Sequence, residues 1–221
     1  MSAPDLDAEK GIAAEAAAEL VEDGMAVGLG TGSTVAHLLP ALAERGLDLT
    51  CVATSPATEK HARELGIMVE RFDTIEALDI AIDGADQIAP DGWLVKGGGG
   101  AHTREKIVAA AAERFVVIAD SSKPVERIGA PIPLELYPFG LASTLLRVAG
   151  ELGEVALRDS APASPDGGVI ADYLGKVTDP AELATMLSAI PGVVDHGLFP
   201  ASMVTEVLVG RGDEVERLAV R

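Results

Sequence analysis

Four loops of this 221-residue chain carry lysines, carboxylates or hydroxyls, the groups that bind anions and move protons, and three of them also carry glycines. Their sequences are GLGTGST at 28–34, IDGADQI at 82–88, KGGGGAHTREK at 96–106 and ADSSKPV at 119–125. Glycine loses more backbone entropy on folding than any other residue, so a run of four indicates that the backbone must approach something closely. These loops are the candidates for a ligand site.

The loop GLGTGST lies between a predicted strand at 25–29 and a predicted helix at 34–45. Backbone N–H groups at such a junction converge on an anion, and Ser33 and Thr34 add hydroxyls, so the loop fits a phosphate site. A methyl-donor cofactor loop has a similar pattern, whereas the dinucleotide fingerprint requires glycine where Ser33 stands. The plainer alternative is that Ser33 or Thr34 caps the helix.

The loop IDGADQI carries Asp83 and Asp86, three residues apart, at the end of an apolar strand. In a turn, both carboxylates can face the same side. We favour proton transfer or hydroxyl binding over metal ligation, because the four histidines of the chain form no ligand spacing with them. The alternative is an Asx-type turn with solvated aspartates.

The glycine run follows Lys96 and leads into a predicted helix at 103–113, with Glu105 in its first turn. A lysine beside a carbonyl oxygen stabilises developing negative charge, and a nearby carboxylate can remove a proton from the adjacent carbon. Glu105 could instead cap the helix N-terminus. In the fourth loop, Lys123 either supplies a cation to a phosphate or belongs to a simple turn.

These loops are positioned by alternating strands and helices. Apolar periodicity predicts helices at 9–22, 34–45, 56–65 and 103–113 and strands at 25–29, 49–53, 67–70, 78–82, 93–95 and 115–119. The alternation predicts an α/β fold with a Rossmann-like, mostly parallel sheet covered by helices on both faces. In such folds ligands bind at the carboxyl ends of the strands, where the four loops lie.

The pattern changes beyond Pro131. It predicts strands at 131–136, 153–158, 168–172 and 192–198 and helices at 141–151 and 179–189. The order β-α-β-β-α-β is the split, ferredoxin-like arrangement. We therefore expect a catalytic domain at 1–129 and 203–221, whose last strands return to the first sheet, and a smaller lid domain at 130–202.

Composition excludes several classes of function. Acidic residues number 35 against 17 basic ones, and the net charge of −18 would repel nucleic acid. This acidic surface suggests salt adaptation of the halophile kind, because screening at high ionic strength relieves the repulsion. The apolar runs are too short to cross a membrane, and no secretory signal is present, so we expect a soluble intracellular protein. The single cysteine, Cys51, excludes an internal disulfide.

In combination, GLGTGSTVAH, IDGADQI, KGGGGAHTREKIVA and ADSSKPV resemble, in order and spacing, the A-type ribose-5-phosphate isomerase family. IPGVV at 190–194 and GLF at 197–199 extend the resemblance over nearly the whole chain. The resemblance implies a cytoplasmic enzyme of the pentose phosphate pathway that interconverts ribose 5-phosphate and ribulose 5-phosphate. It also implies that no cofactor or metal is needed, and that the protein is a homodimer or homotetramer.

The resemblance also assigns roles to residues. Glu105 is the base that moves a proton between C1 and C2, and Asp83, Asp86 and Lys96 line the reacting end of the sugar. The implied substrate-binding residues are Thr31, Gly32, Ser33, Thr34, Asp83, Gly84, Ala85, Asp86, Lys96, Gly97, Gly98, Gly99 and Lys123. Two positions depart from the family pattern: Gln87 stands where glutamate is usual, and His102 where an apolar residue is common.

The sugar is mostly a closed ring, and we assign the relay of the ring-hydroxyl proton to Asp83. Two other classes compete with an isomerase. A sugar-phosphate sensor would keep the phosphate loop without catalysis, but it should carry a DNA-binding segment, and the acidic helix at 9–22 has no basic partner helix. A nucleotide- or methyl-donor-dependent transferase would leave the KGGGG and DGAD loops unexplained.

Overall fold

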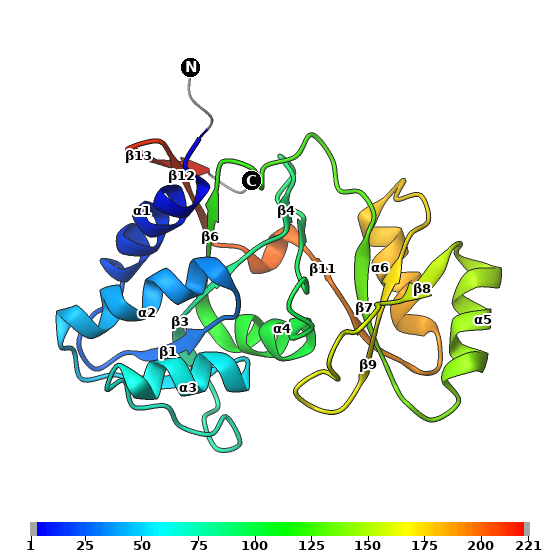
Figure 1. The fold of residues 1–221 in the computed structure, drawn as a ribbon, viewed down its shortest axis with the longest axis horizontal. Coiled ribbons are helices and arrows are strands. Elements are labelled where there is room, and N and C mark those ends of the chain that lie inside the picture. The colour runs from blue at the N-terminus through cyan, green and yellow to red at the C-terminus, as the bar shows by residue number, and fades with distance from the viewer. Residues whose placement is uncertain (1–3, 219–221) are drawn as a thin grey trace.

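The computed structural model describes residues 4–218, and its largest sheet has six strands (Figure 1). These strands are β1 (Ala26–Leu29), β2 (Thr50–Ala53), β3 (Leu78–Gly84), β6 (Ala112–Asp120), β12 (Glu206–Arg211) and β13 (Glu214–Leu218). They follow the order β13-β12-β6-β3-β1-β2, parallel except for β12 with β13. This confirms the predicted Rossmann-like, mostly parallel sheet.

Helices cover both faces of the large sheet. They are α1 (Leu6–Ala18), α2 (Ser33–Arg45), α3 (Pro56–Glu64) and α4 (His102–Ala111). In β6, Val116 and Ile118 pack in the apolar cluster of α1 and α2, whereas Phe115 and Val117 pack in the cluster that contains α4. Because successive strand residues point to opposite faces, α4 lies across the sheet from α1 and α2.

The carboxyl ends of β1, β3 and β6 meet at one edge of the sheet because the three strands are parallel. The loops 30–32, 85–86 and 121–123 leave the sheet at this edge. Three of the four predicted loops are thereby brought together by the topology alone.

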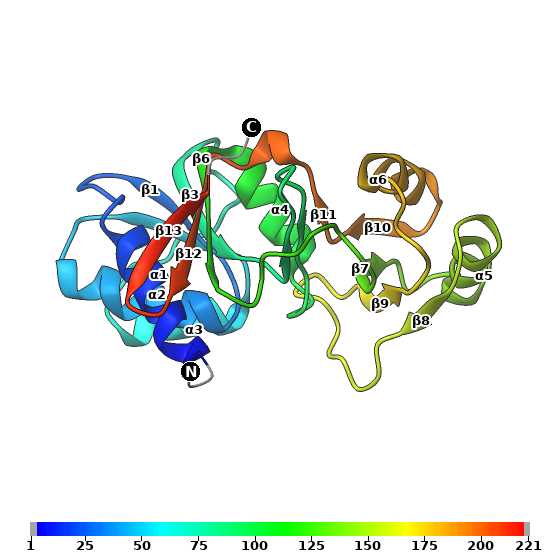
Figure 2. The ribbon, with the colours of Figure 1, turned by 90° about the horizontal axis from the view of Figure 1, so that it is seen from above.

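A second sheet of four antiparallel strands lies beside α4 (Figures 1 and 2). Its elements are β7 (Ile132–Leu136), α5 (Leu141–Glu151), β8 (Val155–Leu157), β9 (Val169–Tyr173), α6 (Pro180–Ala189) and β10 (Val193–His196). The strand order β10-β7-β9-β8 is the predicted ferredoxin-like arrangement. We call residues 132–196 the small unit; the domain boundaries at 130 and 202 stay a prediction.

A third, antiparallel sheet was not expected. It contains β4 (Gln87–Ile88), β5 (Leu94–Val95) and β11 (Leu198–Phe199) in the order β11-β5-β4, and a short 3₁₀ helix, η1 (Ala201–Met203), follows it. The interpretation of 93–95 as part of the parallel sheet is therefore wrong. Only residues 85–93 separate β5 from β3, too few for the crossover that a parallel neighbour needs.

Gly197 divides the predicted strand 192–198 into β10 and β11. Its carbonyl oxygen accepts the Lys96 N–H at 2.9 Å, and a Cβ at Gly197 would lie 2.1 Å from the Lys96 carbonyl oxygen. Only glycine allows this close approach. The junction of the two strands therefore holds the backbone of Lys96 at the end of β5.

Smaller differences concern the ends of elements. The predicted strand 67–70 is wrong, because only Val69 makes a bridge, to Cys51. The predicted helix 9–22 begins and ends earlier, at α1, where the Asp5 carboxylate accepts the Ala8 N–H at 3.2 Å and caps the start. Helix α2 continues through Pro40 to Arg45. The parts of the predictions that fall on 1–3 and 219–221 lie outside the described residues.

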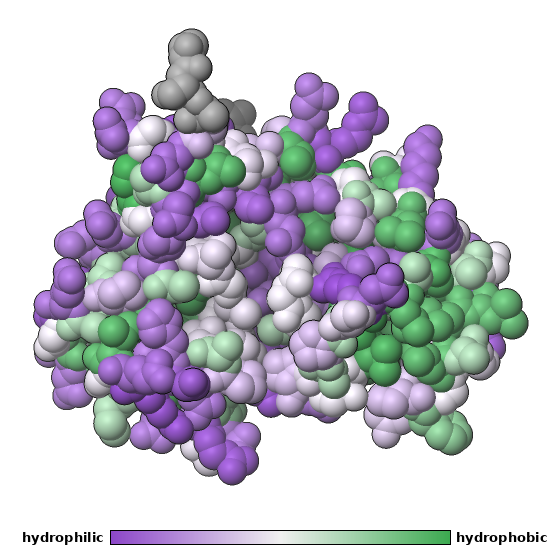
Figure 3. All heavy atoms as spheres, viewed as in Figure 1, coloured by the Kyte–Doolittle hydropathy of each residue, from purple (hydrophilic) through white to green (hydrophobic). Residues whose placement is uncertain are grey.

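The surface of the small unit carries exposed apolar side chains, visible as green areas over the α5 side of the molecule (Figure 3). Phe139 is 86% exposed and Leu146 is 75% exposed. Within the described residues, no helix has the length and apolar character needed to cross a membrane.

Candidate active site

The four predicted loops meet around a cavity with about 500 Å³ of empty volume. Its wall consists of Thr31, Gly32, Ser33, Thr34, Gly84, Ala85, Asp86, Lys96, Gly97, Gly98, Gly99, Glu105 and Lys123. These are all of the residues implied by the sequence except Asp83, which is only 3% exposed and is absent from the wall. Asp83 lies beneath the residues of the wall and is as deeply buried as Lys96, and its part in binding the substrate stays a prediction.

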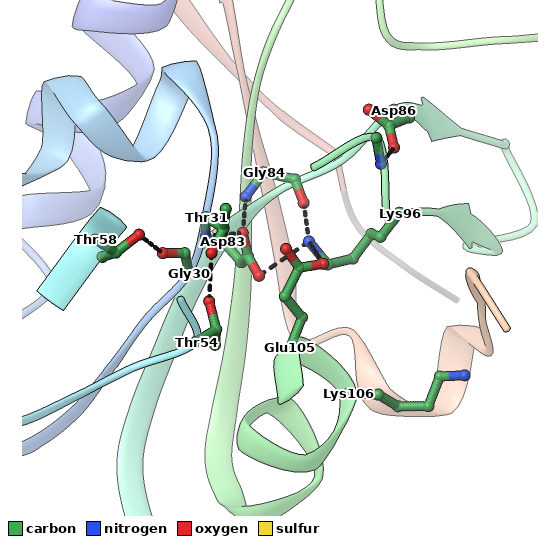
Figure 4. Close-up of polar contacts among 12 residues, drawn as sticks. Gly30, Thr31, Thr54, Thr58, Asp83, Gly84, Asp86, Lys96, Glu105 and Lys106 are labelled. Atoms are coloured by element: carbon green, nitrogen blue, oxygen red, sulfur yellow. Dashed lines mark hydrogen bonds and ion pairs between the residues drawn. The ribbon is translucent and has the colours of Figure 1, made fainter. Parts of the chain in front are cut away.

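Asp83, Lys96 and Glu105 form a buried charged cluster, which we call the Lys96 centre (Figure 4). The Lys96 ammonium lies 2.9 Å from Asp83 Oδ2 and 3.2 Å from Glu105 Oε2, and it donates to the Gly84 carbonyl oxygen at 2.5 Å. β3 supplies Asp83, the end of β5 supplies Lys96, and the first turn of α4 supplies Glu105. The centre thus joins the two larger parts of the site, the sheet edge and the glycine loop.

The two carboxylates of the Lys96 centre are held differently. Asp83 Oδ1 accepts N–H groups from Thr31 at 3.0 Å and from Gly84 at 2.7 Å. Glu105 Oε2 is buried without a hydrogen bond from any described residue, and its 3.2 Å contact with the Lys96 ammonium is an ion pair. A buried oxygen left without a donor costs free energy. Glu105, on the cavity wall, is therefore the carboxylate able to accept a proton from a ligand.

The pKa values follow from two carboxylates sharing one cation. Burial, and then the charge of Asp83, raise the pKa of Glu105 to about 8 despite the opposing effect of Lys96. Burial also raises the pKa of Asp83. Burial lowers the pKa of Lys96, but the two carboxylates more than offset this, and the net direction is upward. At neutral pH, Lys96 stays charged and the carboxyl pair retains a proton in the ligand-free protein.

Two glycines of the motifs allow the carboxylates to lie against the backbone. A Cβ at Gly30 would lie 2.0 Å from Asp83 Cγ. A Cβ at Gly98 would lie 2.9 Å from Asp86 Oδ1, and the Gly98 N–H donates to Asp86 Oδ2 at 2.8 Å. The glycines therefore make room for the protein's own carboxylates as well as for a ligand.

The N-terminus of α2 forms another part of the wall. Its N-cap is Gly32, with φ of 113° and no side-chain cap, so the alternative in which Ser33 or Thr34 caps the helix is wrong. The first N–H groups of a helix have no intrahelical partner and carry partial positive charge. Lys123 adds a cation to the same cavity. Together they form a site suited to an anionic group.

The structure also bears on the alternatives for the carboxylates. Helix α4 has Ala101 at its N-cap without a side-chain cap, so Glu105 is not a capping residue. Asp86 is exposed, as in the Asx-turn alternative, but its carboxylate also accepts the Gly98 N–H and so is linked to the glycine loop. Among the described residues, no group of three or more potential ligands could hold a metal ion. The independence from metals and cofactors stays a prediction.

Two threonines that the sequence analysis missed fix the first loop. Thr54 Oγ1 lies 2.7 Å from Thr31 Oγ1, and Thr58 Oγ1 donates to the Gly30 carbonyl oxygen at 2.8 Å (Figure 4). The signal for Thr54 was its position directly after β2, at the same carboxyl edge of the sheet.

The two positions that depart from the family pattern lie outside the cavity wall. Gln87 exchanges two hydrogen bonds with Gly129, donating at 2.8 Å and accepting at 2.9 Å, which a glutamate could not do in full. His102 is fully buried under Gly97, and neither ring nitrogen has a partner among the described residues. Burial lowers the pKa of His102 to about 4, so its ring is neutral at pH 7.

The fold and the site define a class of protein. It is a Rossmann-like α/β protein in which a helix N-terminus suited to binding an anion lies beside a buried cluster of one lysine and two carboxylates. Comparison with known proteins identifies the family within it. The family model for ribose 5-phosphate isomerase A (phosphoriboisomerase A) matches residues 50–214. The chain belongs to this family.

Curated relatives match over almost their full length. The ribose-5-phosphate isomerase A of Caulobacter vibrioides is 47% identical over 223 residues, which cover 96% of this chain and 98% of the relative. That of Nitrobacter hamburgensis is 46% identical over 220 residues, which cover 93% and 95%. These alignments are long enough to take in nearly all of the chain.

Solved structures show the same fold. Ribose 5-phosphate isomerase A from Neisseria gonorrhoeae matches with a TM-score of 0.94 at 31% identity, covering 100% of both chains. A D-ribose-5-phosphate isomerase in complex with phospho-erythronic acid matches with a TM-score of 0.90 at 33% identity, covering 97% of this chain and 99% of the other. The likeness therefore includes the small unit as well as the large sheet.

Proposed function

We propose that this protein interconverts D-ribose 5-phosphate and D-ribulose 5-phosphate through an enediolate, with Glu105 as the base. The observation that carries the proposal is Glu105 Oε2, which is buried beside the Lys96 ammonium without a hydrogen bond from any described residue, on the wall of a cavity that also holds a site suited to an anion. Membership in the ribose 5-phosphate isomerase A family supports it.

In the proposed reaction, Glu105 removes the hydrogen on C2 of the open-chain aldose. The electron pair forms the C1–C2 double bond, and the carbonyl oxygen on C1 becomes negative. Glu105 then delivers the proton to C1, while the proton of the C2 hydroxyl passes to the oxygen on C1, which leaves a ketone at C2. One carboxylate can serve both carbons because they are neighbours.

The enediolate must be stabilised because a carbon acid beside a carbonyl is far weaker than a carboxylic acid. Lys96 is suited to this, since Asp83 and Glu105 keep it charged and the Gly84 carbonyl fixes its direction. A single well-placed donor to an oxyanion contributes roughly 3 to 4 kcal/mol. Lys96 therefore needs help, and the N–H groups of the glycine loop on the same wall are the nearest candidates.

Ring opening requires a group that exchanges a proton with the sugar. The sequence interpretation gives this task to Asp83, but Asp83 lies under the wall with Oδ1 bonded to two backbone N–H groups. Asp86 lies on the wall. We therefore assign ring opening to Asp86 and the fixing of Lys96 to Asp83.

The phosphate is assigned to the start of α2, with Lys123 as its cation. Phosphate and carboxylate groups bind readily at helix N-termini. The phosphate takes no part in bond changes. Its binding energy holds C1 and C2 against Glu105, which is how contacts remote from the reacting atoms lower a barrier.

The alternative function, a non-catalytic sugar-phosphate sensor, is not favoured. A sensor has no need for a buried carboxylate whose pKa is raised to about 8, whereas such shifts are typical of proton-transfer groups. The two functions are separated by a spectrophotometric assay of ketose formation from ribose 5-phosphate without added metal. An enzyme forms ribulose 5-phosphate; binding of the sugar phosphate without ketose formation would contradict the proposal.

We also propose that the protein is a cytoplasmic homodimer or homotetramer that binds neither nucleic acid nor membranes. The exposed Phe139 and Leu146 support self-association, because exposed apolar patches mark interaction sites. Sedimentation of the purified protein would show the mass of two or four chains. A monomer at all concentrations would contradict this part of the proposal.

The salt-adapted character stays a proposal supported by the net charge of −18. Salt screens repulsion between surface carboxylates, so the melting temperature should rise with ionic strength. Full stability at low salt would contradict it.

A further inference from the structure

Arg158, the residue after β8, joins the small unit to the glycine loop. Its Nη1 donates to the carbonyl oxygens of Gly97 at 2.9 Å and of Gly98 at 3.0 Å. Its Nε and Nη2 donate to the two carboxylate oxygens of Asp172, in β9, at 2.9 and 2.6 Å. The planar guanidinium is thus held rigidly by β9 on one edge while its other edge holds the loop.

The contact determines where the loop's N–H groups point. In a planar trans peptide, the carbonyl and the following N–H point in opposite directions. With the Gly97 carbonyl on Arg158, the Gly98 N–H is directed to Asp86 Oδ2, at 2.8 Å. With the Gly98 carbonyl on Arg158, the Gly99 N–H is directed away from the guanidinium, and in the part of the chain that the structure describes it has no acceptor.

The loop fixes only part of this orientation by itself, because its own Gly100 N–H donates to the Gly97 carbonyl oxygen at 3.0 Å. Four successive glycines have no side chains to pack, and glycine has the widest choice of backbone conformations. Gly98 and Gly99 are exposed on the cavity wall. The restraint on the Gly98 carbonyl must therefore come from outside the loop, and Arg158 supplies it while adding a second contact to the Gly97 carbonyl.

We propose that Arg158 is a positioning residue of the reaction: by holding the Gly97 and Gly98 carbonyls, it presents the Gly99 N–H to the oxygen that becomes negative in the enediolate. This inference rests on the isomerase function proposed above. It gives the small unit a part in catalysis, since Arg158 and Asp172 both belong to it.

The first test compares Arg158→Ala with Arg147→Ala. Arg147 is an exposed arginine on α5 of the same unit, whose 3.5 Å contact is with Glu151. In Arg158→Ala we expect kcat for ribose 5-phosphate to fall roughly 10- to 100-fold with KM little changed, because misplacing a catalytic group by about 1 Å costs up to about 100-fold. Arg147→Ala should keep the kcat of the unchanged protein. Asp172→Asn, which weakens the pair of hydrogen bonds between Asp172 and the Arg158 guanidinium, should also lower kcat, but by less.

Chemical rescue separates positioning from a merely structural role. Guanidinium ion, added far below denaturing concentrations, should restore part of the kcat of Arg158→Ala, whereas ammonium ion and urea should not. A kcat within about twofold of the unchanged protein would overturn the inference, since a lost oxyanion donor costs far more than that. So would a loss of kcat that tracks a loss of thermal stability and is not restored by guanidinium.

Hydrogen exchange tests the restraint without reference to activity. In ligand-free protein, the amides of a peptide covering 97–100 should exchange faster in Arg158→Ala than in Arg147→Ala; equal exchange would overturn the inference. If the unchanged protein produces no ketose from ribose 5-phosphate, the proposed function fails, and the exchange experiment still decides whether Arg158 holds the loop.

Discussion

Two consecutive residues of α4, Glu105 and Lys106, belong to two different lysine–carboxylate clusters. The clusters differ in how many carboxylates surround each lysine. Glu105 belongs to the Lys96 centre, whereas Lys106 is directed away from it (Figure 4). Lys106 Nζ lies 2.6 Å from Asp195 Oδ1 and donates to the His196 carbonyl oxygen at 2.6 Å. We call this cluster the Lys106 centre.

The two centres use the same residue types and share a neighbour. The Lys96 ammonium is 5.5 Å from the centroid of the Phe199 ring, and the Lys106 ammonium is 5.0 Å from it. The Lys106 centre has one carboxylate for one cation, and it ties α4 to β10. The Lys96 centre has two carboxylates for one cation, which leaves Glu105 Oε2 without a donor among the described residues.

The difference teaches that the number of carboxylates per cation, together with deeper burial, separates the reactive centre from the structural one. The side chains of Lys96 and Asp83 are 3% and 4% exposed, whereas those of Lys106 and Asp195 are 19% and 18% exposed. The surplus carboxylate contributes to raising the pKa of Glu105 to about 8, after burial itself. In the Lys106 centre, burial lowers the pKa of Lys106 and Asp195 opposes that shift. A surplus acid can exchange a proton with a ligand, whereas a balanced pair holds two elements together.

Replacing Lys96 should have the largest effect that separates the centres. In Lys96→Met we expect kcat to fall roughly 100- to 1,000-fold, the cost of removing one oxyanion donor. Steady-state kinetics on folded protein, verified by circular dichroism, would measure it. A folded Lys96→Met protein that keeps more than about a tenth of the kcat would contradict the role of Lys96 in stabilising the enediolate.

The pH dependence of activity should follow the ionisation of Glu105. Glu105 must be ionised to act as a base, so kcat/KM should rise roughly tenfold between pH 7 and pH 9, with a midpoint near the pKa of about 8. Initial rates across this range, in buffers of constant ionic strength, would measure the rise. A flat profile would contradict the assignment.

The same shift predicts how stability depends on pH. Because the pKa of Glu105 is raised from 4.5 to about 8 on folding, the native state binds a proton that the unfolded state releases between these values. The contribution of Glu105 is therefore most favourable below pH 4.5 and is lost as the pH rises toward 8. Denaturant unfolding of Glu105→Gln should show a smaller decline over this window; an unchanged decline would place the titrating group elsewhere.

Replacing Lys106 should have the smallest effect on the reaction. Lys106→Met leaves Asp195 without its cation, and we expect the free energy of unfolding to fall by about 1 to 3 kcal/mol, less than for a fully buried pair that loses one partner, because the two side chains are 19% and 18% exposed. kcat at a temperature where the protein is folded should change only a few-fold. A kcat loss as large as that of Lys96→Met would erase the distinction between the two centres.

The sequence predicted the convergence of the loops because parallel strands place their carboxyl ends at one edge. GLGTGST and IDGADQI follow such strands, and ADSSKPV begins at the end of another. The glycine loop was also predicted at the end of a strand, at 93–95, but that strand belongs to a small antiparallel sheet and not to the parallel one. Short strands such as β5 carry too little periodicity to reveal which sheet they join.

Contacts between distant side chains were beyond the sequence. The burial of Asp83 under the cavity wall depends on how β1 and β3 bring Gly30 against it. Arg158 lies about 60 residues from the carbonyls it holds, in a segment with no motif. No local pattern encodes such pairs, because they result from packing the small unit against the large one.

The central claim, that Glu105 carries a proton between C1 and C2, is tested most directly by NMR of the reaction in D₂O. Because a carboxyl can exchange its proton with solvent, the unchanged protein should incorporate deuterium at C1 of ribulose 5-phosphate. Glu105→Gln should bind ribose 5-phosphate with similar affinity by calorimetry and show neither turnover nor deuterium incorporation. Incorporation at an undiminished rate in Glu105→Gln would contradict the account.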